Sequence, residues 1–154
     1  MPDADVFVDS SVLIYLHDRH EPEKAAIAGA TLKRIAEEQR ARTNLQVLNE
    51  VAHVLLRKKW FDSPATVFSI IDAFGVFGKA PITPEQSSLA RLIHVRTAFS
   101  WWDSLLLASA LDLGCTYFLT EDLSDGQRIE LGRGKSLTIV NPFAHSPDQI
   151  LFSR

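Results

Sequence analysis

Residues 5–18, DVFVDSSVLIYLHD, contain a short apolar run, an aspartate, two serines and then a second apolar run. The first run ends at Asp9 and has the length and apolar character of a strand. Ser10 and Ser11 follow at positions where a helix start favours hydroxyl side chains. We therefore expect a strand, a tight turn at Asp9 and then a helix.

The same alternation continues along the rest of the chain. We expect strand character at the start of 42–60 and brief strands over 79–83 (KAPIT), 115–120 (CTYFLT) and 136–140 (SLTIV), with a loop over 121–127. Helices are predicted over 21–41, the rest of 42–60, 63–75, 84–98 and 100–114, the last of these largely buried. Short strands between helices predict an α/β fold with a mainly parallel sheet covered on both faces. No repeat or linker interrupts residues 1–154, so we expect one domain.

The composition is that of an ordinary globular protein, with 46% hydrophobic and 23% charged residues. Uncharged runs fall short of the ~18 apolar residues that a membrane-spanning helix needs, and the acidic N-terminus does not resemble a secretory signal. We therefore expect a cytoplasmic protein. The one cysteine, Cys115, lies in an apolar stretch and is expected to be a buried, unreactive thiol.

The formal net charge of −3 argues against a broad basic surface for nucleic acid. A nucleic-acid substrate would have to be held locally. Two bound divalent cations would change the balance, because they would bring the net charge from −3 to +1. The positions of the acidic residues therefore decide whether such ions have a site.

Four acidic residues occupy positions that the predicted topology brings to one rim. Asp9 and Asp122 stand at or just past the ends of predicted strands, and ligands of open parallel sheets bind at that edge. Glu50 and Asp103 lie near helix starts. Crowded carboxylates must take up protons or bind cations, and Mg²⁺ favours carboxylate and water oxygens. Each acid taken alone is equally consistent with a capping or solvated residue.

Five segments together resemble the motif series of PIN-domain proteins, especially VapC-type toxins. In chain order they are VFVDSSVLIYLHD, LQVLNEVAHVLLRK, SWWDSLLLASALDLGC, FLTEDLSDGQ and TIVNPF. Their order and separations span almost the whole chain. The resemblance implies a three-layer α/β/α sandwich and a ribonuclease that hydrolyses RNA with Mg²⁺ or Mn²⁺.

The resemblance also implies roles for particular residues. The catalytic and metal-binding acids would be Asp9, Glu50, Asp103 and Asp122. Ser10 and Thr120 match hydroxyl residues that support those acids. Asp125 departs from the pattern, because similar loops often carry His there; it is either a fifth carboxylate or, as we favour, a surface charge.

Partners follow from the same resemblance. It implies a homodimer and a VapB-like antitoxin that blocks the acidic cleft with a basic side chain. The helices between Glu21 and Phe74 carry much of the amphipathic pattern, so we expect them to provide the apolar docking surface.

Other interpretations of these residues are weaker. A non-catalytic PIN fold remains the alternative, although all four acids are present, and a phosphoacceptor receiver domain lacks its late-strand lysine. Residues 132–136 (GRGKS) lack the first glycine and the following helix of a phosphate-binding loop. Glu50 and His53 have the spacing of a di-iron pair without a second pair, and the serines lack a nucleophile elbow. Trp101 and Trp102 are expected in the core or supporting the site rather than stacking on bases.

Overall fold

The structure, a computed structural model, describes residues 4–132, 134–144 and 151. Its centre is a five-stranded sheet in the order β2-β1-β3-β5-β4. The strands are β1 (Val6–Val8), β2 (Ala41–Arg42), β3 (Tyr117–Leu119), β4 (Arg128–Glu130) and β5 (Ser136–Val140). All neighbours run parallel except β4, which is antiparallel to β5. The mainly parallel sheet expected from the sequence is confirmed.

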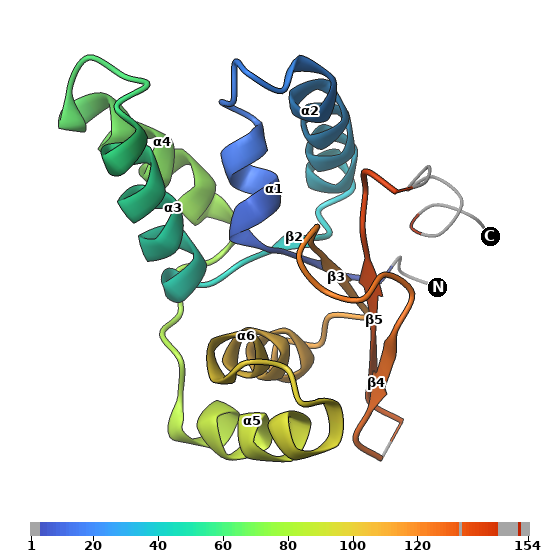
Figure 1. Cartoon of the computed structure of the whole chain (residues 1–154). Coiled ribbons are helices and arrows are strands. Elements are labelled where there is room, and N and C mark those ends of the chain that lie inside the picture. Colours follow the sequence, from blue (N-terminus) through green and yellow to red (C-terminus); the bar gives the residue numbers. More distant parts are fainter. Residues whose placement is uncertain (1–3, 133, 145–150, 152–154) are drawn as a thin grey trace.

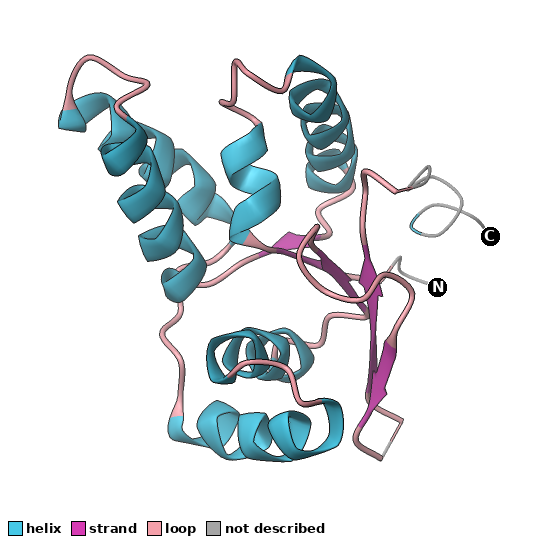
Figure 2. Cartoon of the chain, viewed as in Figure 1, coloured by secondary structure: helices cyan, strands magenta, loops and turns pink. Residues whose placement is uncertain are grey.

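Helices cover both faces of this sheet, which makes the three-layer α/β/α arrangement (Figures 1 and 2). On one face lie α1 (Ser10–Tyr15), α2 (Pro22–Glu37), α3 (Leu45–Lys58) and α4 (Pro64–Phe74), which continues as the 3-10 turn η1 (Gly75–Phe77). On the other face lie α5 (Pro84–Thr97) and α6 (Trp101–Asp112). No helix in the described part of the chain has the length and apolar character to cross a membrane.

The core lies where the central strands meet α6. All three residues of β1 are buried, and the rings of Phe7 and Phe118 stack at 5.2 Å between neighbouring strands. Every α6 residue from Ser104 to Leu111 is buried, as expected for a helix that packs on both the sheet and α5. Cys115 is also buried, and burial raises the pKa of its thiol to about 12. The expected unreactive thiol is therefore protonated at neutral pH.

Two sequence predictions about strands were wrong. Residues 79–83 form no strand: the Leu45 N–H donates to the Ala80 carbonyl oxygen, but this single bond does not extend into a ladder. Pro81 also lacks an N–H for a ladder. Conversely, β4 was not predicted, since three residues with charged ends around buried Ile129 carry almost no strand signal. The turn from β4 to β5 contains Arg133, which lies outside the described residues.

Candidate active site

Neighbouring parallel strands bring Asp9 and Thr120 to one edge of the sheet. Val8 of β1 pairs with Leu119 of β3, so the next residue of each strand lies at the same level. The Thr120 hydroxyl donates a 2.8 Å hydrogen bond to Asp9 Oδ2, and the Ser10 backbone N–H donates to Asp9 Oδ1 at 2.7 Å. Asp9 thereby caps α1, and both of its carboxylate oxygens are held.

Glu50 reaches the same edge from α3. The Ser10 hydroxyl donates to Glu50 Oε2 at 3.0 Å, which links the start of α1 to the middle of α3. The start of α3 is held in turn by Asn44, whose side chain accepts from the Val47 N–H and donates to Ser109 Oγ of α6. The position of Glu50 therefore depends on helices from both faces of the sheet.

Asp122 and Asp103 approach from the remaining sides. The Asp122 backbone N–H donates to Thr120 Oγ1 at 3.2 Å, so one threonine contacts both Asp9 and the loop that carries Asp122. Asp103 lies half-buried in the first turn of α6, which Ser100 caps by accepting from the Asp103 N–H. The Asp122 side chain is exposed.

The electrostatics connect all four acids. Burial is the largest cause that raises the pKa of Asp9 to about 7, and repulsion from Glu50 and Asp122 adds to it, while hydrogen bonds from Thr120 and Ser10 oppose it. Burial and then the charge of Asp103 raise the pKa of Glu50. Asp122 is exposed at its surface but its carboxylate is still partly surrounded by protein; this partial burial and the charges of Glu121 and Asp103 raise its pKa, and Lys24 opposes them. Each carboxylate is thus within repulsive range of at least one other, so a cation at this edge would lower the energy of the ionised forms.

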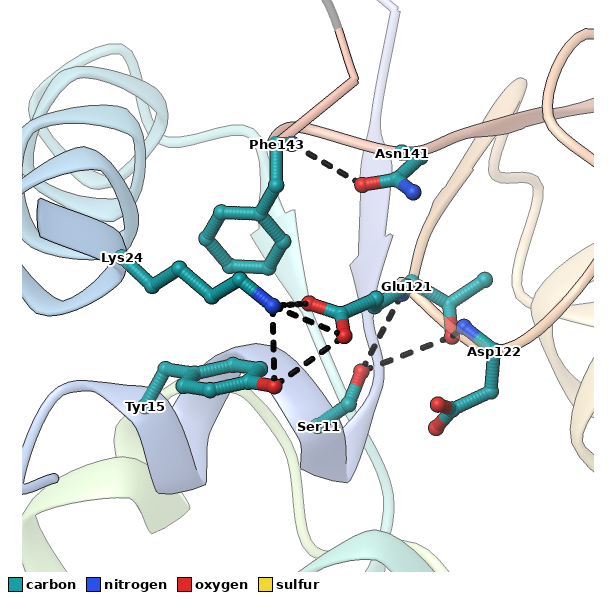
Figure 3. Close-up of polar contacts among 8 residues, drawn as sticks. Ser11, Tyr15, Lys24, Glu121, Asp122, Asn141 and Phe143 are labelled. Carbon is teal, nitrogen blue, oxygen red and sulfur yellow. Dashed lines mark hydrogen bonds and ion pairs between the residues drawn. The ribbon is translucent and has the colours of Figure 1, made fainter. Parts of the chain in front are cut away.

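A second group of side chains supports the Asp122 loop, as Figure 3 shows. Lys24 of α2 forms an ion pair with Glu121 at 3.0 Å and donates to the Tyr15 hydroxyl, which itself donates to Glu121. The Lys24 ammonium lies 4.9 Å from the centre of the Tyr15 ring and 5.5 Å from that of Phe143. Glu121 is the immediate neighbour of Asp122, so this group fixes the loop on the side away from Glu50.

The sequence analysis missed these residues. The contact between Lys24 and Glu121 joins positions 97 residues apart, and neither residue lies in a spacing that indicates chemistry. Ser11, expected only as a helix-start hydroxyl, also accepts from the Glu121 backbone N–H at 3.3 Å. The adjacency of Glu121 to Asp122 was the single local signal, and an acid beside another acid in a loop is usually only a solvated charge.

An open cleft of about 670 Å³ adjoins the acidic edge at Ser10 and Glu50. Ser10 and Glu50 belong both to its wall and to the acidic edge. The other lining residues come from α3, the segment before α5, and the start of α6: Leu45, Gln46, Asn49, His53, Val54, Pro81, Ile82 and Trp102.

The comparison with protein-family models matches residues 6–124 to the PIN domain. That span includes all four acids and most of the chain. The chain belongs to the PIN-domain family. No curated protein matched this PIN domain in a sequence search.

Solved structures share the fold at low sequence identity. The VapC20 toxin of Mycobacterium tuberculosis, described as cleaving the sarcin-ricin loop, is 19% identical with a TM-score of 0.55, over 74% of this chain and 87% of that one. VapBC2 from Rickettsia felis, bound to a fragment of its promoter DNA, is 12% identical with a TM-score of 0.55, over 76% and 86%. PAE2754 from Pyrobaculum aerophilum is 15% identical with a TM-score of 0.53, over 78% and 82%.

The donor set of this PIN domain fits a hard divalent cation that keeps part of its water shell. Among the residues that the structure describes, no three His, Cys, Asp or Glu side chains converge closely enough to enclose an ion by themselves. Ser10 and Thr120 instead occupy oxygens of Glu50 and Asp9. Mg²⁺ commonly takes one or two direct carboxylate ligands and several waters, so carboxylates linked pairwise suffice.

Two surface residues of this PIN domain have clear positions. Asp125 Oδ1 accepts from the Asn141 backbone N–H at 2.7 Å, so its carboxylate ties the loop before β4 to the end of β5. Trp102 is 64% exposed and lines the cleft, which contradicts the expected core or supporting position. Trp102 lies in the first turn of α6, and a side chain there can point away from the face of the helix that packs on the sheet.

Proposed function

We propose that this PIN domain is a metal-dependent endoribonuclease and the toxin of a type II toxin–antitoxin pair. The observation that carries the proposal is the electrostatic connection of Asp9, Glu50, Asp103 and Asp122 at the edge of the sheet. A buried acid with a pKa of about 7 among other acids costs free energy, and cation binding removes that cost. Perturbed acids at the end of parallel strands are candidates for function.

The four acids would hold Mg²⁺ or Mn²⁺. A bound cation of this kind supplies an activated water and charge stabilisation for phosphodiester hydrolysis. The role of the chain itself is to keep the acids oriented: Thr120 and Ser10 donate to Asp9 and Glu50 and so restrict which carboxylate oxygens face the substrate. Thr120 also joins Asp9 to the loop of Asp122, so these two acids move as one unit.

Partners are proposed from fold similarity and surface character. The similarity to VapC20 and VapBC2 supports a VapB-like antitoxin for this chain. Exposed apolar side chains on the helices between Glu21 and Phe74 fit the docking surface expected there: Ile27, Leu45, Leu56 and Phe68. Homodimer formation stays a prediction, for which exposed Leu92 and Val95 on α5 offer a second apolar face.

The test is RNA cleavage by the purified protein with Mg²⁺, with Mn²⁺ and after chelation. Cleavage should need a divalent cation. Asp103→Asn should reduce it by two or more orders of magnitude, because it removes one negative charge from the cation site. Asp112→Asn is the matched control at the other end of α6, where, within the described part of the chain, its carboxylate accepts from Gln86 alone.

The outcomes separate the proposal from its alternative. Asp112→Asn should cleave like the wild type, and both variants should fold. Cleavage that persists after full chelation would contradict the proposal. Metal-independent RNA binding with no cleavage would support the non-catalytic module instead.

A further inference from the structure

The cleft beside Glu50 combines three features that the acidic edge does not use. Trp102 is 64% exposed on its wall, although a large aromatic side chain gains free energy by burial. Asn49 and His53 also line it, and neither side chain has a hydrogen-bond partner among the described residues. The cleft is therefore apolar with a few unpartnered polar groups, which is the character of a binding site.

Charge along α3 changes sign away from the acids. Asn49, His53 and Arg57 are spaced four residues apart and so follow one another along one side of the helix. Arg57 is exposed and forms no ion pair with any described residue. It lies seven residues, roughly 10 Å along the axis, beyond Glu50. Arg57 does not line the cleft itself, but an RNA strand that leaves the acidic edge and follows α3 beyond the cleft would reach this cation.

We infer that this cleft binds an unpaired nucleobase of the RNA next to the phosphate that is cut. The base stacks on Trp102, Asn49 and His53 hydrogen-bond to its edge, and Arg57 contacts a neighbouring phosphate. This inference rests on the proposed ribonuclease function, and it adds the subsite that selects single-stranded RNA. Stacking of bases on exposed aromatic side chains is one way in which proteins hold single strands without sequence preference.

A basic peptide fits the same cleft less well. Glu50 is the one acid among the described lining residues, and Ser10 and Gln46 already donate to it. Arg57 would repel a basic chain at the far end. An RNA strand has the opposite charge to Arg57 and carries a planar base at each residue, so it matches both the cation and the exposed ring.

Fluorescence can report on Trp102 alone once the other two of the chain's three tryptophans are replaced. The variant Trp60→Phe/Trp101→Phe keeps Trp102, and the matched control Trp60→Phe/Trp102→Phe keeps Trp101, which is 38% exposed and does not line the cleft. Both are made in an Asp122→Asn background with Mg²⁺, so that RNA stays intact. The probes are short homopolymers of A, C and U.

RNA should quench the Trp102 reporter and leave the Trp101 reporter nearly unchanged. Trp102→Ala should weaken RNA binding about tenfold, the size expected for one lost base–aromatic stack, while Trp102→Phe should retain most of it. RNA that carries an abasic nucleotide at the position next to Trp102 has no base to stack on this ring. Such RNA should therefore bind the wild-type protein and the Trp102→Ala variant with equal affinity.

The outcomes distinguish this inference from the ribonuclease proposal. Metal-dependent RNA cleavage with a silent Trp102 reporter would overturn the inference and leave the ribonuclease proposal standing. Quenching of Trp102 without any cleavage by the wild type would keep the subsite and remove the ribonuclease. A Trp102 response to an arginine- and leucine-containing peptide, but not to RNA, would assign the cleft to a protein segment and overturn the inference.

Discussion

The two sides of the acidic edge differ in how their side chains are paired. On the side of Asp122, Lys24 contacts Glu121 and Tyr15, and Phe143 closes the group. On the side of Glu50, Trp102 is 64% exposed. Arg57, further along that side, has no ion pair within the described residues. One side has its charges and rings satisfied within the fold, whereas the other leaves them to solvent.

This difference suggests two roles: the Lys24 group stabilises the fold and the Asp122 loop, whereas the cleft beside Glu50 is available to bind a ligand. The Lys24 group joins α1, α2 and the loop after β3, so its contacts already stabilise the folded chain. The exposed side chains of the cleft, Asn49, His53 and Trp102, contribute little to the isolated fold, because exposed groups far from packed features have small effects on stability. Substitutions on the first side should therefore change stability and site geometry together, and those on the second should change only ligand binding.

The largest expected effect concerns Asp9, which Thr120 connects to the loop that carries Asp122. Its pKa is about 7 in the fold, against 3.8 as the ordinary value. Between these values the folded state holds a proton that the unfolded chain has released, so the stability from this group is complete below the lower pKa and is lost as pH rises through 7. We expect metal-free protein to lose up to a few kcal/mol between about pH 5 and about pH 8.

Urea unfolding at several pH values after chelation measures this loss. Asp9→Asn should flatten the dependence, because the amide does not titrate. Added Mn²⁺ should stabilise the wild type most at the alkaline end, where the carboxylates are ionised. Stability of the metal-free wild type that rises steadily across the window would contradict the assignment of a proton to Asp9.

The next prediction removes the ion pair between Lys24 and Glu121. Lys24→Met leaves the Glu121 carboxylate without its cation beside Asp122, so we expect RNA cleavage to fall about tenfold, as for residues that orient metal ligands. The matched control is Lys33→Met, because Lys33 is exposed on the same helix and has no partner among the described residues. A thermal melt should show a lower Tm for Lys24→Met than for the control.

A double variant distinguishes positioning from general damage. Lys24→Met/Glu121→Gln removes both charges, so cleavage should recover toward the wild-type rate and the two changes should not be additive. If the double variant lost the product of the two single losses, Lys24 and Glu121 would act independently of each other, and the paired-positioning explanation would be wrong.

The smallest effect concerns the open side. Arg57→Gln should weaken RNA binding a few-fold and reduce the slope of log affinity against log salt by about 0.7, the value for one phosphate contact on a single strand. Its Tm should equal that of the wild type. Lys58→Gln is the neighbouring control, since the Lys58 ammonium lies 5.9 Å from the centre of the Trp60 ring. Equal salt slopes for wild type and Arg57→Gln would remove Arg57 from the RNA path.

Much of the fold was predictable because its signals are local. The strand at 136–140 was predicted with its observed bounds, and the helix at 100–114 was expected to be buried, as it is. The predicted strand at 79–83 was wrong because a short apolar segment does not reveal whether a neighbouring segment continues a ladder with it, and here only Ala80 accepts a backbone bond from Leu45. The four acids stay predicted site residues, and their connection through Ser10 and Thr120 needed the contacts of the folded chain.

Sequence alone determined most of the strands and helices, the family resemblance and the positions of Asp9, Asp103 and Asp122 near a strand end or helix start, because these depend on neighbouring residues, whereas Glu50 lies in the middle of α3 and not near its start. Tertiary structure decided which charges are paired. Lys24 meets Glu121 across 97 positions, and Trp102 faces the cleft rather than the core. The physical reason is that burial and ion pairing depend on which distant segments pack together, so they follow from the whole fold and not from spacing along the chain.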